Sequence, residues 1–293
     1  MRTQLPGYSP LTAGAIGRAW LSTMTGRSEI HGELLAGYLR ASYTAEEALL
    51  TSSGTHALQI GISLARAAGG HGPDAPVALP AYSCFDLVTA AVGANASVVF
   101  YDINPGTLAP DPRSLEIALD RKPFALVAAN LYGFPLDWDL LRASAEASGA
   151  VLIEDAAQGL GSTLHEKAGG SFGDLTVLSF SRGKGWTGGG GGALLARGRL
   201  VAAARDAIAE FGEHPVPGGR MSGFVSLAQW LLGRPSFYGL PRAVPRLALG
   251  ETRYRSPTPS TPATLFSRSL AWSTRVSATQ EVQGRQANAG ELR

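Results

Sequence analysis

The sequence VLIEDAAQ, at residues 151–158, places an apolar run directly before two carboxylates, Glu154 and Asp155. Residues 151–154 have the length and apolar content of a buried strand. Burial raises the pKa of a carboxylate unless a cation or hydrogen-bond donors compensate for the lost water, so an acid at this strand end needs a partner. The stretch predicts a buried strand with polar chemistry at its carboxyl end, although Asp155 would serve equally as the N-cap of a segment beginning at Ala156.

Similar apolar runs lie on both sides of this one and alternate with segments of helical period. We expect strands at residues 77–79, 97–101, 125–131, 176–180 and 193–195, and helices at residues 111–119, 137–148 and 200–211. Alternation of this kind favours an α/β fold, with a mainly parallel sheet covered by helices on both faces.

The composition is that of a well-buried globular protein, since 45% of the 293 residues are hydrophobic and 16% are charged. The net charge is +2 and the basic residues are scattered, so no nucleic-acid partner is expected. The single cysteine, Cys84, excludes an intramolecular disulfide and a Cys-based zinc site, and the histidines show no metal-ligand spacing. The N-terminus lacks a signal-peptide pattern and no apolar run reaches membrane length, so we expect a cytoplasmic protein without a membrane partner.

The character of the chain changes after Gly212. Prolines and glycines become frequent, helical periodicity weakens, and residues 256–262 (SPTPSTP) have the composition of a loop or linker. Residues 278–293 have helical character again. We therefore expect a large domain at residues 1–212, followed by a small, incomplete C-terminal α+β domain at residues 213–293.

Ligands of open α/β sheets gather at the carboxyl ends of the strands, where a second segment is expected to meet Asp155. Residues 52–58 (SSGTHAL) lead from a turn of small residues into an apolar helix. Exposed backbone N–H groups at such a helix start, with hydroxyls beside them, make a phosphate cradle. An ordinary N-cap would explain the same residues.

A third segment, residues 177–184 (VLSFSRGK), delivers Lys184 from a buried-looking strand to a loop that continues into a glycine run at residues 188–192. Most lysines are solvated at the surface. A lysine desolvated here would instead have a lowered pKa and act as an amine nucleophile toward an aldehyde, with the glycines letting backbone approach a ligand. The glycine run would also suit a flexible loop. A phosphate-binding P-loop is excluded, because Leu178 and Gly185 stand where its first glycine and its Ser or Thr belong.

Taken in order, these segments resemble the DegT/DnrJ/StrS family of aminotransferases, which depend on pyridoxal 5'-phosphate (PLP) and have fold type I. The resemblance spans residues 52–195 and rests on the motifs SGTHAL (53–58), LPAYSC (79–84), VFYDI (99–103), NLYG (130–133), EDAAQ (154–158), GSFGD (170–174) and SF (179–180) ahead of Lys184. It implies a three-layer αβα PLP-transferase large domain.

The resemblance implies a role for each matching position. Lys184 would hold PLP as a Schiff base and move the proton between substrate and cofactor, while Asp155 would bind the pyridinium nitrogen and keep the ring an electron sink. Gln158 would contact the region of the ring hydroxyl. The phosphate would be held by Gly54, Thr55 and Ser179.

The chain departs from the family pattern in four places. Leu160 stands where many members have His, and Cys84 matches the cofactor-stacking position, where an aromatic ring would give a stronger contact than a thiol. Either the match is out of register by a residue or two, between Tyr82 and Phe85, or the pocket differs from that of the family. The lysine loop with its glycine run is unusual for the sugar enzymes. Residues 212–293 match no family motif, and members are typically longer at this end.

The resemblance implies an enzyme that takes an amino group from glutamate or glutamine and places it on a keto sugar. The sugar is usually nucleotide-linked, in polysaccharide or secondary-metabolite biosynthesis, and the enzymes work as homodimers. Relatives that dehydrate sugars carry His at the lysine position, so Lys184 argues against that reaction. Two alternatives stay open: a PLP-binding protein without turnover, either regulatory or a truncated remnant, and a structural α/β domain with no cofactor.

Overall fold

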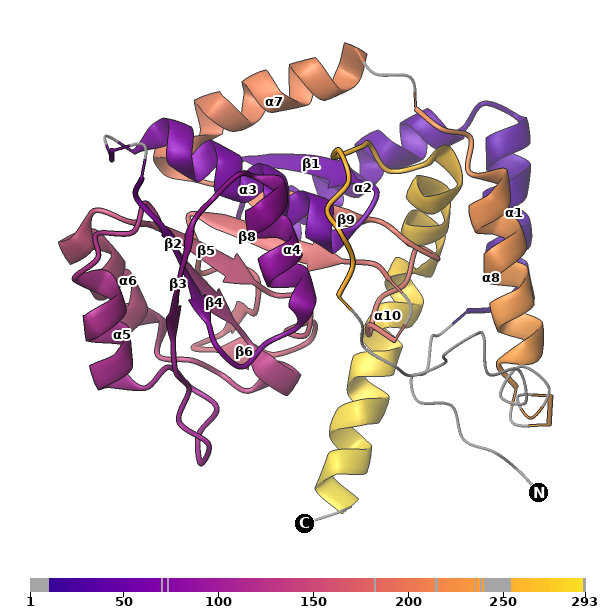
Figure 1. Cartoon of the computed structure of the whole chain (residues 1–293). Helices are drawn as coiled ribbons and strands as arrows, with labels where there is room; N and C mark the ends of the chain where they lie inside the picture. The colour runs from indigo at the N-terminus through magenta and orange to yellow at the C-terminus, as the bar shows by residue number, and fades with distance from the viewer. Residues whose placement is uncertain are drawn as a thin grey trace.

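The computed structural model describes residues 11–69, 71–72, 74–181, 183–213, 216–234, 236–237, 239 and 254–291. Its centre is a seven-stranded sheet with the order β1-β9-β8-β5-β4-β2-β3 (Figure 1). The strands are β1 (Glu47–Thr51), β2 (Val77–Pro80), β3 (Val98–Tyr101), β4 (Ala125–Ala129), β5 (Val151–Asp155), β8 (Leu175–Ser179) and β9 (Gly192–Ala196). Strand β9 runs antiparallel to both of its neighbours and the other pairs are parallel, which confirms the expected mainly parallel sheet.

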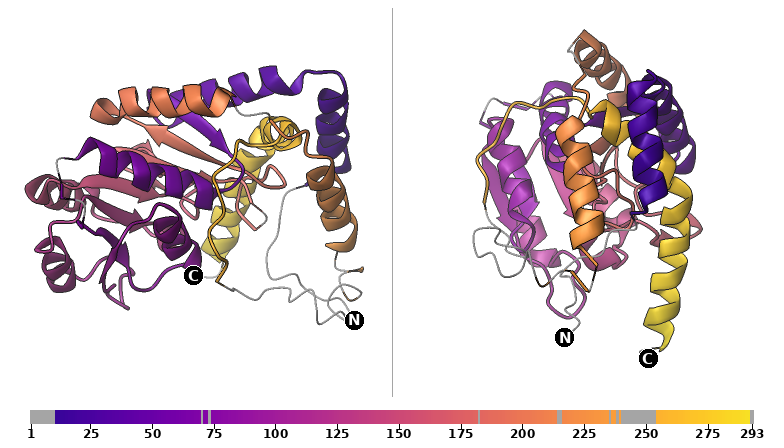
Figure 2. Two further views of the ribbon diagram at one scale, coloured as in Figure 1. Left: turned by 45° about the horizontal axis from the view of Figure 1, so that its top comes forward. Right: turned by 90° about the vertical axis from the view of Figure 1, so that its right-hand side faces the viewer.

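Helices cover both faces of this sheet, as Figures 1 and 2 show. One face buries apolar side chains of α3, α4 and α7, and the opposite face packs against α2, α5, α6 and α10. These helices are α2 (Ser28–Ser42), α3 (Gly54–Ala68), α4 (Phe85–Gly93), α5 (Pro112–Leu119), α6 (Trp138–Ser148), α7 (Val201–Glu213) and α10 (Leu265–Glu291). The three-layer αβα architecture is therefore confirmed.

The central strand β5 shows why its two carboxylates have different surroundings. Side chains alternate between the two faces of a strand. Val151 and Ile153 belong to the core under α3 and α4, whereas Leu152 belongs to the core under α5 and α6. Glu154 and Asp155 therefore point to opposite faces of the sheet.

Two helices in the described part of the chain beyond residue 215 pack against the N-terminal helices. Helix α8 (Arg220–Leu232) contacts α1 (Ala13–Met24), and α10 contacts both α1 and α2. A small core of Ala15, Ile16, Ala19, Phe266 and Leu270 joins α1 to α10. The predicted domain boundary after residue 212 stays a prediction.

Two predicted element boundaries were wrong. The strand expected at 125–131 ends at Ala129, because the chain turns at Tyr132, whose φ of 54° is left-handed. The helix expected from residue 278 begins at Leu265, where the Thr264 hydroxyl accepts a hydrogen bond from the Ser267 N–H and so caps it. Within the part of the chain that the structure describes, no helix is long and apolar enough to cross a membrane.

Candidate active site

A pocket opens at the carboxyl ends of β5 and β8, beside the start of α3. Its lining includes every residue predicted from the sequence to bind the cofactor: Gly54, Thr55, Cys84, Asp155, Gln158, Ser179 and Lys184. Asp155 and Ser179 are the last residues of their strands, and Gly54 is the first residue of α3. The parallel strands bring these side chains together from segments that are far apart in the sequence.

Asp155 supplies a carboxylate to this pocket. Its Oδ1 accepts a hydrogen bond of 3.0 Å from the Ala157 N–H, but residues 156–162 form turns and no helix begins at Ala156, so the helix N-cap interpretation was wrong. Desolvation raises the pKa of Asp155, while the Ala157 hydrogen bond and the charge of Lys184 oppose that rise. The acid thus lies in a poorly solvated position where a cationic ligand group would find a partner.

Glu154 lies on the opposite face of β5, where backbone N–H groups of the fold surround its carboxylate. Its fully buried carboxylate accepts hydrogen bonds from the N–H groups of Gly170 (2.6 Å) and Phe172 (2.8 Å). Burial raises the pKa of Glu154, and these donors and the charge of Arg197 oppose that rise. Arg197 in turn donates to the carbonyl oxygens of Gly170 and Tyr43, each at 2.7 Å. Glu154 therefore fixes the loop before β8, and Asp155 alone of the two acids serves the pocket.

The start of α3 lies at the pocket, where the sequence predicts a phosphate cradle. Ser53 is the N-cap and its Oγ accepts from the His56 N–H at 3.1 Å, which confirms the capping interpretation. Helix geometry gives the first N–H groups, those of Gly54 and Thr55, no intrahelical acceptor, and both residues line the pocket. A Cβ on Gly54 would lie 3.0 Å from the Ser179 Cβ, so glycine lets the helix start approach the Ser179 hydroxyl closely.

Lys184 lies in the same pocket, where its charge acts on two neighbours. It lowers the pKa of Asp155 and also opposes the rise that burial causes in the pKa of Cys84. The Cys84 Sγ donates to Asp86 Oδ2 at 3.5 Å. The amine, the acid and the thiol thus converge on one space, as predicted.

Three polar pocket residues were missed from the sequence: Ser53, Asp86 and Ser181. Asp86 lies in the first turn of α4, directly after β2, and its charge raises the pKa of Asp155. The position of Asp86 in the sequence, shortly after a predicted strand, could have identified it. Residues that follow the carboxyl end of a parallel strand lie at the edge of the sheet where ligands bind.

The glycine run at residues 188–192 does not line the pocket, so the expectation that it approaches a ligand was wrong. It crosses beneath α10 and beside the start of α3: the Gly191 N–H donates to the Ser52 carbonyl oxygen at 3.0 Å. A Cβ on Gly192 would lie 2.6 Å from the Gly54 nitrogen, and one on Gly188 would lie 3.1 Å from the Ala271 Cβ. The run is needed for close backbone packing behind the cradle.

Two tyrosines, called the rim tyrosines below, are linked to the pocket through Gln158, a residue of its lining. The Tyr132 N–H donates to the Gln158 Oε1 at 2.9 Å, and the hydroxyls of Tyr132 and Tyr82 lie 3.4 Å apart. Both side chains are largely exposed, at 67% for Tyr132 and 57% for Tyr82. A left-handed φ is strained for a bulky residue, and such strain concentrates at functional sites.

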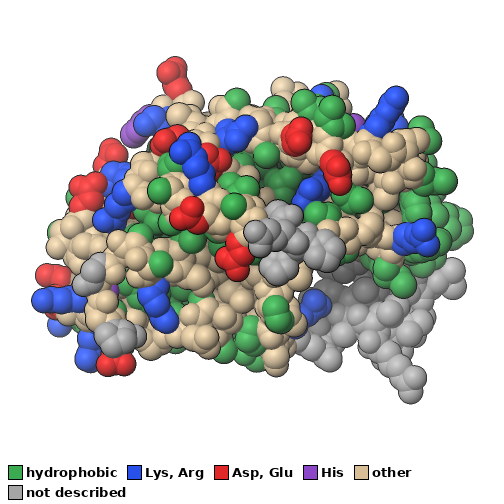
Figure 3. All heavy atoms as spheres, turned by 90° about the horizontal axis from the view of Figure 1, so that it is seen from above, with side chains coloured by type: hydrophobic (Ala, Val, Ile, Leu, Met, Phe, Trp, Pro, Cys, Tyr) green, Lys and Arg blue, Asp and Glu red, His purple; other side chains and the backbone are tan. Residues whose placement is uncertain are grey.

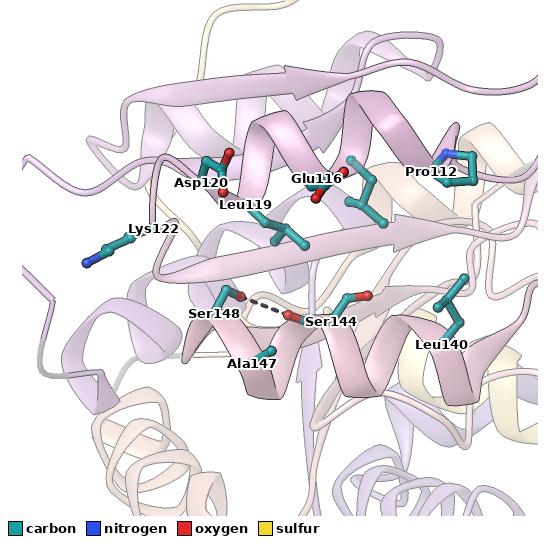
Figure 4. Close-up of a pocket in the computed structure, with 10 residues that line it drawn as sticks. Pro112, Glu116, Leu119, Asp120, Lys122, Leu140, Ser144, Ala147 and Ser148 are labelled. Atoms are coloured by element: carbon teal, nitrogen blue, oxygen red, sulfur yellow. Dashed lines mark hydrogen bonds between the residues drawn. The ribbon is translucent and has the colours of Figure 1, made fainter.

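A second hollow lies between α5 and α6 (Figure 4). Glu116 and Leu119 lie on the α5 side and Leu140 and Ser144 on the α6 side, with Asp120 and Lys122 at one end. None of the predicted site residues is in its lining, so this hollow is not the candidate active site.

Residues 20–224 match the family model described as the DegT/DnrJ/EryC1/StrS aminotransferase family. The chain belongs to this family. PLP is the cofactor of the family, and the pocket fits it: a lysine amine, a desolvated carboxylate, and a helix start with a hydroxyl for a phosphate.

The alignments with individual relatives span only part of each relative, and those with the curated relatives also span only part of this chain. The L-glutamine:2-deoxy-scyllo-inosose aminotransferase of Streptomyces kanamyceticus is 35% identical over 52% of this chain and 34% of its own length. A pleiotropic regulatory protein of Geobacillus stearothermophilus is 33% identical over 50% of this chain and 37% of its own length. The matches therefore span about a third of the length of these curated relatives. The crystal structure of DesI with its TDP-sugar product has the same fold, with a TM-score of 0.67 at 20% identity, covering 96% of this chain and 63% of DesI.

Proposed function

We propose that the protein is a PLP-dependent aminotransferase that moves an amino group from glutamate or glutamine to a keto sugar or a related cyclic ketone. The observation that carries this proposal is the convergence of Lys184, Asp155, Gln158 and the start of α3 on one pocket. Bound PLP supplies an electron sink for the substrate carbon that loses its proton.

Each pocket residue has a role in this proposal. The Lys184 amine would hold the cofactor covalently and, once released by substrate, would move the proton of the substrate carbon. Asp155 pairs with the ring nitrogen, for which its desolvated position suits it, and Gln158 lies beside the ring. The N–H groups at the α3 start and the Ser179 hydroxyl would donate hydrogen bonds to the phosphate. The Cys84 thiol would contact the ring face, with a smaller gain than an aromatic side chain would give.

The names of relatives support both substrates. L-glutamine and 2-deoxy-scyllo-inosose are in the name of the Streptomyces enzyme, and the DesI structure includes a TDP-sugar product. The exposed rim tyrosines, Tyr82 and Tyr132, suit a hydroxyl-bearing ring as acceptor, because a phenol offers both an apolar face and a hydrogen-bonding group.

The test is amino transfer by the purified protein. With PLP and glutamine or glutamate, we expect amination within a panel of free cyclic ketones and nucleotide-linked keto sugars, followed by mass spectrometry of the products. Bound PLP without transfer to any acceptor, and without conversion of either donor, would contradict the proposal.

A PLP-binding protein without turnover is the second candidate, supported by the regulatory relative from Geobacillus stearothermophilus. The donor reaction separates the two candidates. An aminotransferase converts one equivalent of glutamate or glutamine to the keto acid even without acceptor, whereas a cofactor-binding regulator leaves the donor unchanged.

A homodimer is part of the proposal. Exposed apolar side chains gather at the end of the molecule formed by α1 and α8 (Figure 3), namely Leu21, Met24, Met221 and Phe224. An apolar patch of this kind marks an interaction surface, and a second copy of this chain is the partner we propose. Light scattering that finds only monomers at micromolar concentration would contradict it.

Replacing Tyr132 tests whether this side chain contacts the acceptor. Tyr132→Asn should raise the free energy of unfolding by about 1 kcal/mol, because Asn tolerates a left-handed φ better than Tyr. The same change should raise KM for the acceptor about tenfold and leave the donor reaction unchanged, because one hydrogen bond and one aromatic contact with the acceptor are lost. Chemical denaturation and separate kinetics of the two half-reactions measure these effects. A donor reaction that falls in parallel with the acceptor reaction would refute a role on the acceptor side.

A further inference from the structure

A strap formed by residues 254–263 crosses the start of α3 before the chain enters α10. In Figure 1 this gold segment passes beside α4 and α3. The Ser52 N–H donates to the Thr261 carbonyl oxygen at 2.9 Å, and the Ala263 N–H donates to the Leu50 carbonyl oxygen at 3.2 Å. Further along, the Thr89 hydroxyl donates to the Arg255 carbonyl oxygen at 2.9 Å. The strap is thus tied at both ends to elements that border the pocket.

His56 joins the middle of the strap to α3 through both ring nitrogens. Its Nδ1 lies 2.6 Å from the Ser52 Oγ, and the Thr261 N–H donates to the same nitrogen at 3.4 Å. On the other side of the ring, Nε2 lies 3.0 Å from the Thr258 Oγ1. The Thr261 hydroxyl donates to the Ser52 Oγ at 3.0 Å and closes the network.

The network assigns one protonation state to His56. A backbone N–H can only donate, so the Nδ1 that receives the Thr261 N–H must be an acceptor. The proton of the neutral ring is then on Nε2, which donates to Thr258. A cationic His56 would direct a second N–H at the Thr261 N–H and would lose this hydrogen bond to the strap.

We propose that His56 is a positioning residue for the cofactor phosphate: by holding the strap on the first turn of α3, it fixes the N–H groups of Gly54 and Thr55 that line the pocket. The inference rests on the proposed function, which supplies the phosphate. His56 is in the same helical turn as Gly54 and Thr55, but it is not in the pocket lining, so it acts through the turn and not by contact.

The hydrogen bonds between His56 and the strap have a defined pH dependence. Burial lowers the pKa of His56 below its ordinary value of 6.5, and the groups that face its ring nitrogens, from Ser52, Thr258 and Thr261, are uncharged. Because the pKa of His56 is lower in the folded state, neutral His56 stabilises the fold fully at pH values above its unfolded-state pKa. This stabilisation is lost as pH falls through its folded-state pKa. The hydrogen bond between His56 and the Thr261 N–H should therefore be present at neutral pH and lost in acid.

His56→Ala tests the proposal through two readouts. Amide hydrogen exchange at Thr261 should become about tenfold faster or more, since the hydrogen bonds that hold it are lost. Affinity for PLP should fall about tenfold, while affinity for pyridoxal, which has no phosphate, should stay unchanged. In the wild type, the protection factor at Thr261, which corrects for the slower intrinsic exchange in acid, should fall on acidification, and in His56→Ala it should not.

His71→Ala is the matched control, because the His71 Nε2 bonds the Gly149 carbonyl oxygen at 3.0 Å, away from the strap. It should change neither exchange at Thr261 nor either affinity. Unchanged Thr261 exchange in His56→Ala would overturn the proposal, as would equal losses of PLP and pyridoxal affinity. If the wild type binds neither compound, the proposed function and the phosphate role of His56 both fail. Exchange at Thr261 then decides separately whether His56 holds the strap.

Discussion

Asp155→Asn is expected to fold like the wild type and to lose about 10²–10³-fold in amino transfer, the loss typical of removing one preorganised electrostatic group. The amide occupies the same space and can still accept from the Ala157 N–H, so the turn after β5 is retained. It carries no charge to pair with a protonated ring nitrogen, so the electron sink is weakened. Steady-state kinetics with saturating PLP, combined with denaturant unfolding, measure both effects.

Two results would contradict this role for Asp155. One is transfer within a few-fold of the wild type, which would move the ring-nitrogen partner to another group; Asp86, the second carboxylate of the pocket, is the residue to test next. The other is a loss of stability as large as the loss of activity, which would make Asp155 a structural cap.

Glu154→Ala is expected to have the opposite profile, with a loss of about 3–5 kcal/mol in the free energy of unfolding. The substitution leaves the buried N–H groups of Gly170, Phe172 and Gly173 without their acceptor, and it removes the negative charge that accompanies Arg197. Urea unfolding followed by circular dichroism measures the effect, with Asp155→Asn as the matched control at the adjacent position.

We therefore expect Asp155→Asn to lower activity and Glu154→Ala to lower stability, although the two acids are adjacent. A Glu154→Ala protein as stable as the wild type would show that the loop before β8 does not depend on this carboxylate. Any fraction of Glu154→Ala that folds should still bind PLP, because Glu154 points away from the pocket.

Much of the fold and of the pocket could be predicted from sequence because both depend on local pattern. Apolar runs such as 151–154 are buried strands whatever follows them, and parallel strands deliver their last residues to one edge. The motif positions around Asp155, Ser179 and Lys184 therefore converge as expected. Their individual roles stay predictions.

The features that sequence reasoning missed depend on contacts between distant segments. The two acids of β5 look equivalent in the sequence, and only the loop at Gly170–Gly173 shows that Glu154 is structural. The glycine run resembles a ligand loop until α10 and α3 are seen packed against it. His56 matches no metal or catalytic spacing, because its partners at 258–261 lie about 200 residues away.

The central claim is that Lys184 holds PLP, and borohydride reduction followed by peptide mapping tests it most directly. The chain has three lysines, and Lys122 and Lys167 are exposed and lie outside the pocket, so they serve as internal controls for non-specific labelling. The account predicts a visible absorbance band that borohydride abolishes, with one pyridoxyl group per chain on Lys184. A folded protein that shows no band, or that carries the label on Lys122 or Lys167 instead, would contradict it.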